Sequence, residues 1–366
     1  MDPLAHTLVG ATLAETRLRE TTALASPALI LGANAPDVDA ITMFISRDLS
    51  LGFRRGWTHG VLAMVVLPLV LTALLLLLDR LVARLRGRKP AARAGPLLGL
   101  SSLAVLTHPV LDWLNTYGVR FLMPFDGTWF YGDALFVVDP WVWLLTATTV
   151  VLAHSASRAG AMAWVVLGIA TTSLVAGFEV APAAARLLWC LGVACILWLR
   201  LAGRWRRRLP RLAVICLSAV ATYIAVMVAA SRVAEQQVAA WLAERDDHAA
   251  AEIMASPAPG NPFRRDIVVA DAEHYHFLDL DWLAAEPVRI AARSIERGPD
   301  GPIIEAALSA PHVQGLAAWI RFPAYVVEET AGGYRVSISD ARYAWRGGGL
   351  GAAVVELDRD LRVLSR

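Results

Sequence analysis

Residues 58–79 read THGVLAMVVLPLVLTALLLLLD, and between His59 and Asp79 this stretch contains no ionisable side chain. A helix of that length is roughly 33 Å long, which is enough to cross the hydrocarbon core of a bilayer. The whole chain of 366 residues is 57% hydrophobic and 18% charged, which is too apolar for an ordinary soluble domain. We therefore expect a multi-pass integral membrane protein that is mainly α-helical.

Further apolar stretches predict about six membrane crossings in total, preceded by a less apolar segment at 1–57. The predicted spans are 58–79, 96–114, 135–153, 161–178, 184–200 and 212–231. These spans and the segment before them make up a membrane-embedded domain, residues 1–231.

The positions of the basic residues predict the orientation. One cluster follows the first span and consists of Arg80, Arg84, Arg86, Arg88, Lys89 and Arg93. A second cluster consists of Arg200, Arg204, Arg206, Arg207, Arg208 and Arg211. Both are expected on the cytoplasmic side, as is usual for a bacterial-type inner membrane. The loop 114–134 and everything after about residue 231 are then expected outside.

The C-terminal part, 232–366, is predicted to be a separate extracytoplasmic domain. An amphipathic helix is expected over 232–254, followed by helix-breaking residues around Gly260. The runs RRDIVVA, PVRIAARSI, YVVEE and YRVSISD then indicate a small, mostly β module. The net charge of the chain is only +2, so nothing favours nucleic acid as a partner.

Polar side chains converge at the expected outer ends of two spans. His59 begins the first span, and the segment THPVLDWLN ends the next with His108, Asp112 and Asn115. The spacing of i, i+4 and i+7 places these three on one helix face. Imidazole and carboxylate groups are the usual ligands of zinc. A buried His–Asp hydrogen bond would produce the same pattern, so a metal site and a structural pair both stand as interpretations.

Other candidate residues lie upstream. Asp37 and Asp39 in NAPDVD follow a proline-containing turn, so both carboxylates can reach one cation, although simple solvent exposure also explains them. His6 lies in the apolar segment AHTLVG, where packing alone is an alternative to ligation.

Two further acids precede or begin the third span. Asp139, in FVVDPWVW, is expected to orient a ligand imidazole, with ligation of the metal and capping of a helix as alternatives. Asp133 could likewise orient an imidazole, ligate the metal or cap a helix.

The ordered motifs AHTLVG, NAPDVD, RGWTHG, THPVLDWLNTYG and LMPFDGTWFYGDALFVVDP resemble the YdjM-like family of membrane-bound proteins, described as metal-dependent hydrolases. The resemblance covers about residues 1–150. In ligand types and order the family is also similar to the zinc-dependent phospholipases C and single-strand nucleases, which hydrolyse phosphate esters. This chain lacks the N-terminal tryptophan and the further histidines of those soluble enzymes, so one or two ions are expected.

The resemblance implies one metal-binding group, which consists of His6, Asp37, Asp39, His59, His108 and Asp112. Asp133 and Asp139 would support it. The ion would be zinc, with manganese as an alternative. Asp37 or Asp39 would take the proton of the attacking water, and the amide of Asn115 would stabilise developing charge. The expected substrate is a phosphoester of a lipid or of a lipid-linked molecule at the outer face of the membrane.

Two alternatives belong to other functional classes. A transporter would use the His/Asp cluster as an ion path, but residues 135–231 carry almost no ionisable groups in their apolar cores. A non-catalytic membrane scaffold would need no metal. In the C-terminal domain, His274 and His276 share a strand face and could chelate, but without an obvious third ligand we interpret them as surface packing.

Overall fold

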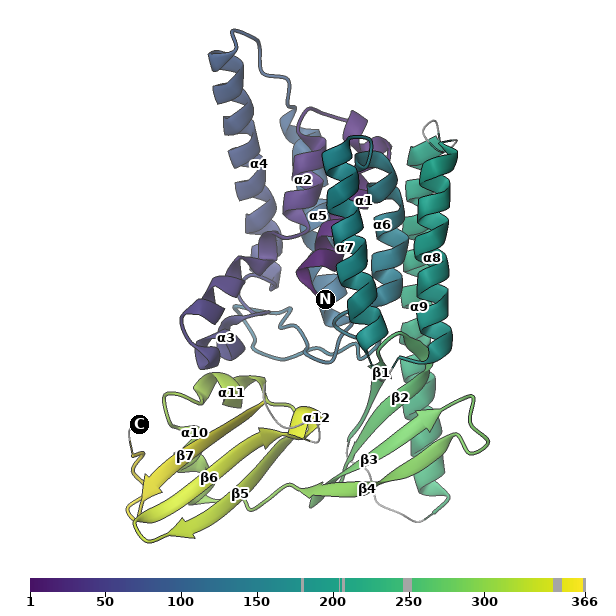
Figure 1. Cartoon of the computed structure of the whole chain (residues 1–366). Coiled ribbons are helices and arrows are strands. Elements are labelled where there is room, and N and C mark those ends of the chain that lie inside the picture. Colours follow the sequence, from purple (N-terminus) through teal and green to yellow (C-terminus); the bar gives the residue numbers. More distant parts are fainter. Residues whose placement is uncertain (179–180, 204, 206–207, 246–251, 345–350, 365–366) are drawn as a thin grey trace. The chain divides into compact units, whose positions relative to one another are not determined.

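The computed structural model describes residues 1–178, 181–203, 205, 208–245, 252–344 and 351–364 (Figure 1). The chain forms two compact units. The first, which we call the membrane unit, comprises 1–38, 55–230 and 257–262. The second, which we call the C-terminal unit, comprises 39–54, 231–256 and 263–366.

The helical part confirms the predicted fold class, because five helices among the described residues are long and apolar enough to span a membrane. They are α4 (Val61–Leu85), α5 (Ala94–Trp113), α7 (Arg158–Gly177), α8 (Ala183–Ala202) and α9 (Leu209–Ala243). The predicted span 135–153 is instead the shorter helix α6 (Pro140–His154), with 15 residues. At 1.5 Å per residue it is roughly 22 Å long, less than the thickness of the hydrocarbon core.

The first 38 residues form a helical hairpin within the membrane unit. Helix α1 (Pro3–Ala14) leads through the short 3₁₀ helix η1 (Arg17–Glu20) to α2 (Ala25–Gly32), and α1 and α2 pack against each other and against α5. Thr22 Oγ1 accepts a hydrogen bond of 2.7 Å from the backbone N–H of Arg93, just before α5. The turn of the hairpin therefore lies at the basic end of the bundle, and α2 returns the chain to the opposite end.

Two glycines allow these helices to approach closely. A Cβ atom at Gly10 of α1 would lie 2.6 Å from the carbonyl oxygen of Leu29 in α2. A Cβ atom at Gly32 of α2 would lie 2.7 Å from the Cβ atom of Ala104 in α5. Small residues at helix contacts are the usual means of close packing in membranes. These two glycines therefore let α2 pack closely against both α1 and α5.

The ends of the bundle differ in charge. The segment between α4 and α5 lies at the same end of the membrane unit as the end of α8 and the start of α9 (Figure 1). The first basic cluster and the described members of the second, which are Arg200, Arg208 and Arg211, lie at this end; Arg204, Arg206 and Arg207 are outside the described residues. The start of α4 and the end of α5 lie at the other end, which is where the predicted site residues cluster.

The C-terminal unit is built on two antiparallel sheets, as the β-rich runs predict. One sheet has the order β1-β2-β3-β4, from β1 (Glu252–Ala258), β2 (Asn261–Ala270), β3 (His274–Asp281) and β4 (Val288–Glu296). The other has the order β5-β6-β7, from β5 (Pro323–Thr330), β6 (Gly333–Asp340) and β7 (Ala352–Asp358). Three short helices complete it: α10 (Pro302–Leu308), α11 (Gln314–Trp319) and α12 (Ala341–Ala344).

Two features of this unit differ from the prediction. The helix expected over 232–254 is the last part of α9, and it ends at Ala243. The residues from Glu252 onward belong instead to strand β1, which pairs with β2. Residues 246–251 are outside the described residues. The unit also includes the N-terminal helix α3 (Arg47–Phe53), which packs on α11. The Asp48 carboxylate accepts the amides of Gly315 and Leu316, both at 2.9 Å.

Candidate metal centre

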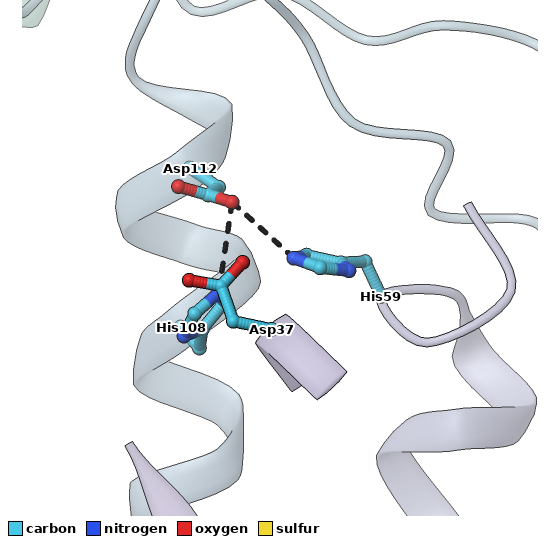
Figure 2. A group of neighbouring side chains, drawn as sticks. All are labelled: Asp37, His59, His108 and Asp112. Carbon is cyan, nitrogen blue, oxygen red and sulfur yellow. Dashed lines mark ion pairs between the residues drawn. The ribbon is translucent and has the colours of Figure 1, made fainter. Parts of the chain in front are cut away.

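Four of the predicted ligands come together at one end of the membrane unit (Figure 2). Asp37, His59, His108 and Asp112 each offer one ligand atom, and these atoms all lie within 4.8 Å of one another. Asp37 lies in the 3₁₀ helix η2 (Ala35–Phe44), His59 just before α4, and the other two on α5. Both histidines and Asp112 are buried, whereas the Asp37 side chain is 15% exposed.

The imidazole of His108 is held with one nitrogen pointing into the cluster. Its Nδ1 lies 2.7 Å from the carbonyl oxygen of Ala33, which can only accept a hydrogen bond, so Nδ1 carries the proton. Nε2 then presents a lone pair. It lies 3.6 Å from Asp37 Oδ1 and 3.6 Å from Asp112 Oδ2, beyond the usual hydrogen-bond distance.

His59 is arranged in a similar way. Its Nδ1 lies 2.9 Å from the hydroxyl oxygen of Thr58, and its Nε2 lies 3.3 Å from Asp112 Oδ2. Four ligands around a tetrahedral ion with bonds of about 2.0–2.1 Å are about 3.3–3.4 Å apart. The separations of 3.3 Å and 3.6 Å between nitrogen and carboxylate atoms are therefore close to those of a zinc site.

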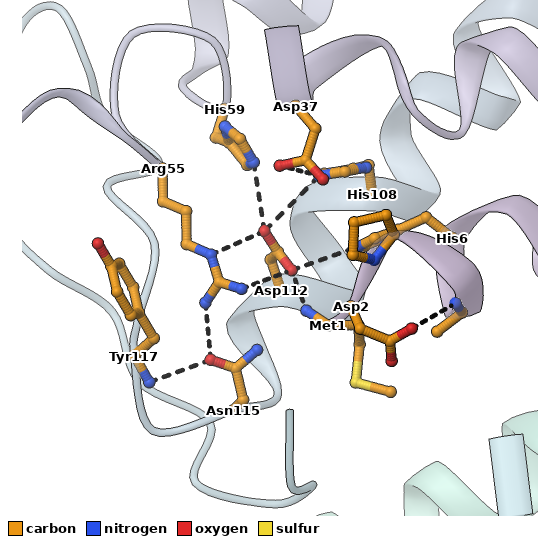
Figure 3. Close-up of polar contacts among 12 residues, drawn as sticks. Met1, Asp2, His6, Asp37, Arg55, His59, His108, Asp112, Asn115 and Tyr117 are labelled. Carbon is orange, nitrogen blue, oxygen red and sulfur yellow. Dashed lines mark hydrogen bonds and ion pairs between the residues drawn. The ribbon is translucent and has the colours of Figure 1, made fainter. Parts of the chain in front are cut away.

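Arg55 also belongs to the cluster, although we did not predict it from the sequence (Figure 3). Its Nε lies 2.9 Å from Asp112 Oδ2, and its Nη2 lies 3.0 Å from Asp112 Oδ1. Its Nη1 donates to Asn115 Oδ1 at 2.7 Å, and the same oxygen accepts the backbone N–H of Tyr117 at 3.0 Å. Asn115 therefore positions Arg55 through its oxygen. The only sequence signal was that Arg55 is the first residue of the RGWTHG motif, four positions before His59.

His6 lies on the other side of Asp112. Its Nε2 is 3.2 Å from Asp112 Oδ1, an oxygen that also contacts the amino group of Met1. The His6 ring stacks on the His108 ring, with 3.6 Å between centroids and 14° between planes. His6 thus joins the predicted residues but is not one of the four whose ligand atoms converge.

The remaining predicted residues lie elsewhere. Asp39 is buried and forms an ion pair with Arg54 at 3.5 Å, in the C-terminal unit. Asp133 is buried in the segment before α6, with a positive φ of 46°, and is not among the four converging groups.

Asp139 caps α6 instead of orienting an imidazole, which corrects the preferred interpretation. Its Oδ1 accepts the amides of Trp141 and Val142 at 2.9 and 3.0 Å, and its Oδ2 accepts the Tyr223 hydroxyl at 2.9 Å. The amides at a helix start need such acceptors, which explains the burial of this acid.

The fold and the cluster define a multi-pass membrane protein with a buried His/Asp group at one end of its helical bundle. The chain belongs to the YdjM inner membrane protein family, whose family profile matches residues 1–183. That range contains the whole cluster.

One similar protein is "Uncharacterized protein YfhP" from Bacillus subtilis (strain 168), which is 23% identical over 133 residues. The match covers 36% of this chain and 38% of that protein, so the chain spans well under half of its relative's length. No solved structure matches the chain.

Proposed function

We propose that Asp37, His59, His108 and Asp112 bind a divalent metal ion and that the protein is a membrane-bound metal-dependent hydrolase. Its substrate is a phosphoester of a lipid or a lipid-linked molecule at the outer face of the membrane. One observation carries the proposal. The Nε2 atoms of His59 and His108 face carboxylate oxygens at 3.3–3.6 Å, while the Nδ1 atom of each ring is engaged outside the cluster.

The donor set fits zinc. Histidine ligands of a metal usually bond a carbonyl or another oxygen through their second nitrogen, as His108 does with Ala33. His108 Nε2 is buried without a hydrogen-bond partner among the described residues, which is unfavourable unless a cation binds there. Two imidazoles with two carboxylates suit zinc better than manganese, which prefers oxygen ligands.

Each residue then has a role. If these residues hold a divalent ion, it would activate a water molecule as the nucleophile for hydrolysis. Asp37, which at 15% exposure is the least buried of the four, would accept the proton of that water. Arg55 holds Asp112 through both oxygens, and His6 packs on His108, so these two position the ligands.

The location supports a lipid-type substrate. The cluster lies where α4 begins and α5 ends, at the end opposite the basic segments, which by the positive-inside rule is the outer one. Trp57, next to this start, is 51% exposed, and aromatic side chains of this kind favour the interface between water and lipid. A lipid head group therefore lies at the depth of the site while its chains stay in the bilayer.

A non-catalytic scaffold is the second candidate, and one observation favours it. Arg55 already provides a positive charge that contacts both carboxylate oxygens of Asp112, so the network can be stable without a metal. A transporter is less well supported, because the described part of α7 has no ionisable residue after Arg158 at its start.

Hydrolysis by protein in lipid nanodiscs tests the proposal. The probes are phosphatidic acid and phosphatidylglycerol, with release of inorganic phosphate and of the head group as readouts. We expect activity that a chelator abolishes and zinc restores, that His108→Ala eliminates, and that His154→Ala retains. His154 is a matched control, because its imidazole pairs with Glu15 at 2.9 Å away from the cluster. Activity that survives chelation, or zinc-loaded protein inactive on both probes, would contradict this function for these lipids.

A further inference from the structure

The C-terminal unit contains a second group of metal-ligand residues. Asp271, His274 and His276 each offer a ligand atom, and these atoms lie within 4.8 Å of one another. Asp271 lies in the turn between β2 and β3, and the two histidines are on β3. The sequence suggested only the two histidines, and the turn supplies the third group.

The turn fixes the direction of the carboxylate. Asp271 Oδ1 accepts the backbone N–H groups of Glu273 at 2.8 Å and His274 at 2.6 Å. The backbone N–H of Asp271 donates to the carbonyl oxygen of His274 at 3.0 Å, which closes the turn. Oδ2 is left directed at the β3 strand, where it lies 2.7 Å from His276 Nε2.

The strand places both imidazoles on one face. Residues two apart on a strand point to the same side, and Tyr275 between them is buried against Phe322 on the other side. The two rings lie 5.8 Å apart between centroids. The side chains of Asp271 and His276 are 13% and 26% exposed, so an ion in water can reach them.

A simple hydrogen bond explains only part of this arrangement. It accounts for Asp271 and His276, but no hydrogen bond holds the His274 imidazole within the part of the chain that the structure describes. His274 nevertheless brings a nitrogen to the same point. Two imidazoles and a carboxylate are the donor set of many zinc sites.

We propose that Asp271, His274 and His276 bind a divalent transition ion such as zinc. The ion takes the place of the hydrogen atom between His276 Nε2 and Asp271 Oδ2, so these atoms separate from 2.7 Å to about 3.3 Å, and the neutral imidazole carries its hydrogen on Nδ1 instead.

The strand register places one further carboxylate beside His274, although it is not among the three converging groups. Glu296 on β4 is paired with His274 in the antiparallel ladder, and directly opposed residues point to the same face. Glu296 is exposed, so its carboxylate is available to complete four-coordination.

Zinc binding to the full-length protein in detergent tests the proposal. The chelator-stripped chain is dialysed against zinc, and bound ions per chain are counted for wild type, His274→Ala/His276→Ala, Asp271→Asn and His312→Ala. His312 is an exposed histidine of the same unit outside the cluster and serves as the control. The count for the double variant should fall by one ion per chain, and the His312→Ala count should not change.

The Asp271→Asn variant tests the site in a chain that we expect to keep the native turn. Its amide oxygen still accepts the two backbone N–H groups of the turn, so the turn persists while the charge is lost. We expect zinc affinity at this site to fall by at least about tenfold, a loss that even outer partners of metal ligands produce. His108→Ala should leave this ion in place. Equal zinc counts for wild type and the folded double variant, or no change in affinity with Asp271→Asn, would overturn the proposal.

Discussion

Arg55 contacts both carboxylate oxygens of Asp112, with Nε 2.9 Å from Oδ2 and Nη2 3.0 Å from Oδ1, and both side chains are buried. Removing one partner of a buried ion pair leaves an uncompensated charge. We expect Arg55→Gln to lower the free energy of unfolding by about 3–5 kcal/mol. The measurement is unfolding in detergent followed by tryptophan fluorescence.

The control for this prediction is Arg19→Gln. Arg19 pairs with Glu15 at 2.9 Å, but its side chain is 42% exposed, so its loss should change stability by less than about 1 kcal/mol. If the two variants were equally stable, Arg55 would not be the counter-charge that holds Asp112.

Gly60 provides a steric test of the site. A Cβ atom there would lie 2.3 Å from the carbonyl oxygen of Met123, so Gly60→Ala must displace backbone next to His59. We expect zinc affinity in the membrane unit to fall by at least about tenfold, because His59 moves away from Asp112. Gly99→Ala in α5 meets nothing within 4 Å and should bind zinc like wild type. Unchanged affinity in folded Gly60→Ala would speak against His59 as a ligand.

The orientation of the chain is testable by labelling. In a background without the native cysteines, we expect Leu283→Cys to react with a membrane-impermeant maleimide added to spheroplasts if the C-terminal unit lies outside, as the positive-inside rule predicts. Lys89→Cys, in the basic segment between α4 and α5, should react only after the membrane is permeabilised. Both positions are exposed in the structure. The reverse pattern would place the His/Asp cluster at the cytoplasmic face.

The stability of the C-terminal unit should depend on alkaline pH through Tyr275. Burial raises the pKa of its phenol from 10.0 to about 12. The folded state therefore favours the neutral phenol. The contribution of the neutral phenol to the stability of the unit is fully present below pH 10, the pKa in the unfolded chain. This contribution is lost as the pH rises through the folded-state pKa of about 12.

Tyr275→Phe removes this dependence. The variant also loses the hydrogen bond to the carbonyl oxygen of Pro323 at 2.8 Å, so it should be about 1 kcal/mol less stable at neutral pH. The stability difference from wild type should shrink above pH 10, as measured by unfolding at several pH values. A difference that stays constant with pH would show that this phenol titrates normally.

Much of the fold could be predicted from hydropathy and strand patterns, because lipid-facing helices and alternating strands leave strong periodic signals. The exceptions have physical reasons. Asp139 caps the start of α6, so the helix begins at Pro140 and not at 135 as predicted. The observed helix is therefore too short to cross a bilayer. The 1–38 hairpin is built from short helices whose packing depends on Gly10 and Gly32, and hydropathy windows do not detect such contacts.

The site was predictable where motif spacing places ligands on one element, as for His108 and Asp112. It was not predictable where partners come from distant segments. Arg55 meets Asp112 across 57 positions in the sequence, and nothing local indicates the pair. Asp37 and Asp39 looked equivalent, but only Asp37 joins the four converging groups. In the C-terminal unit, the turn geometry that brings Asp271 to His276 could not be predicted from the sequence either.

The most direct test of the central claim is the metal content of the membrane-unit cluster. Protein purified without chelators is analysed for metals as wild type, as His108→Ala/Asp112→Asn, and as His154→Ala, all in a His274→Ala/His276→Ala background that removes the C-terminal site. We expect about one equivalent of zinc in the parent and in His154→Ala, and loss of that zinc in His108→Ala/Asp112→Asn. A metal-free parent that also fails to bind added zinc would show that the cluster is not a metal site and would favour a non-catalytic scaffold.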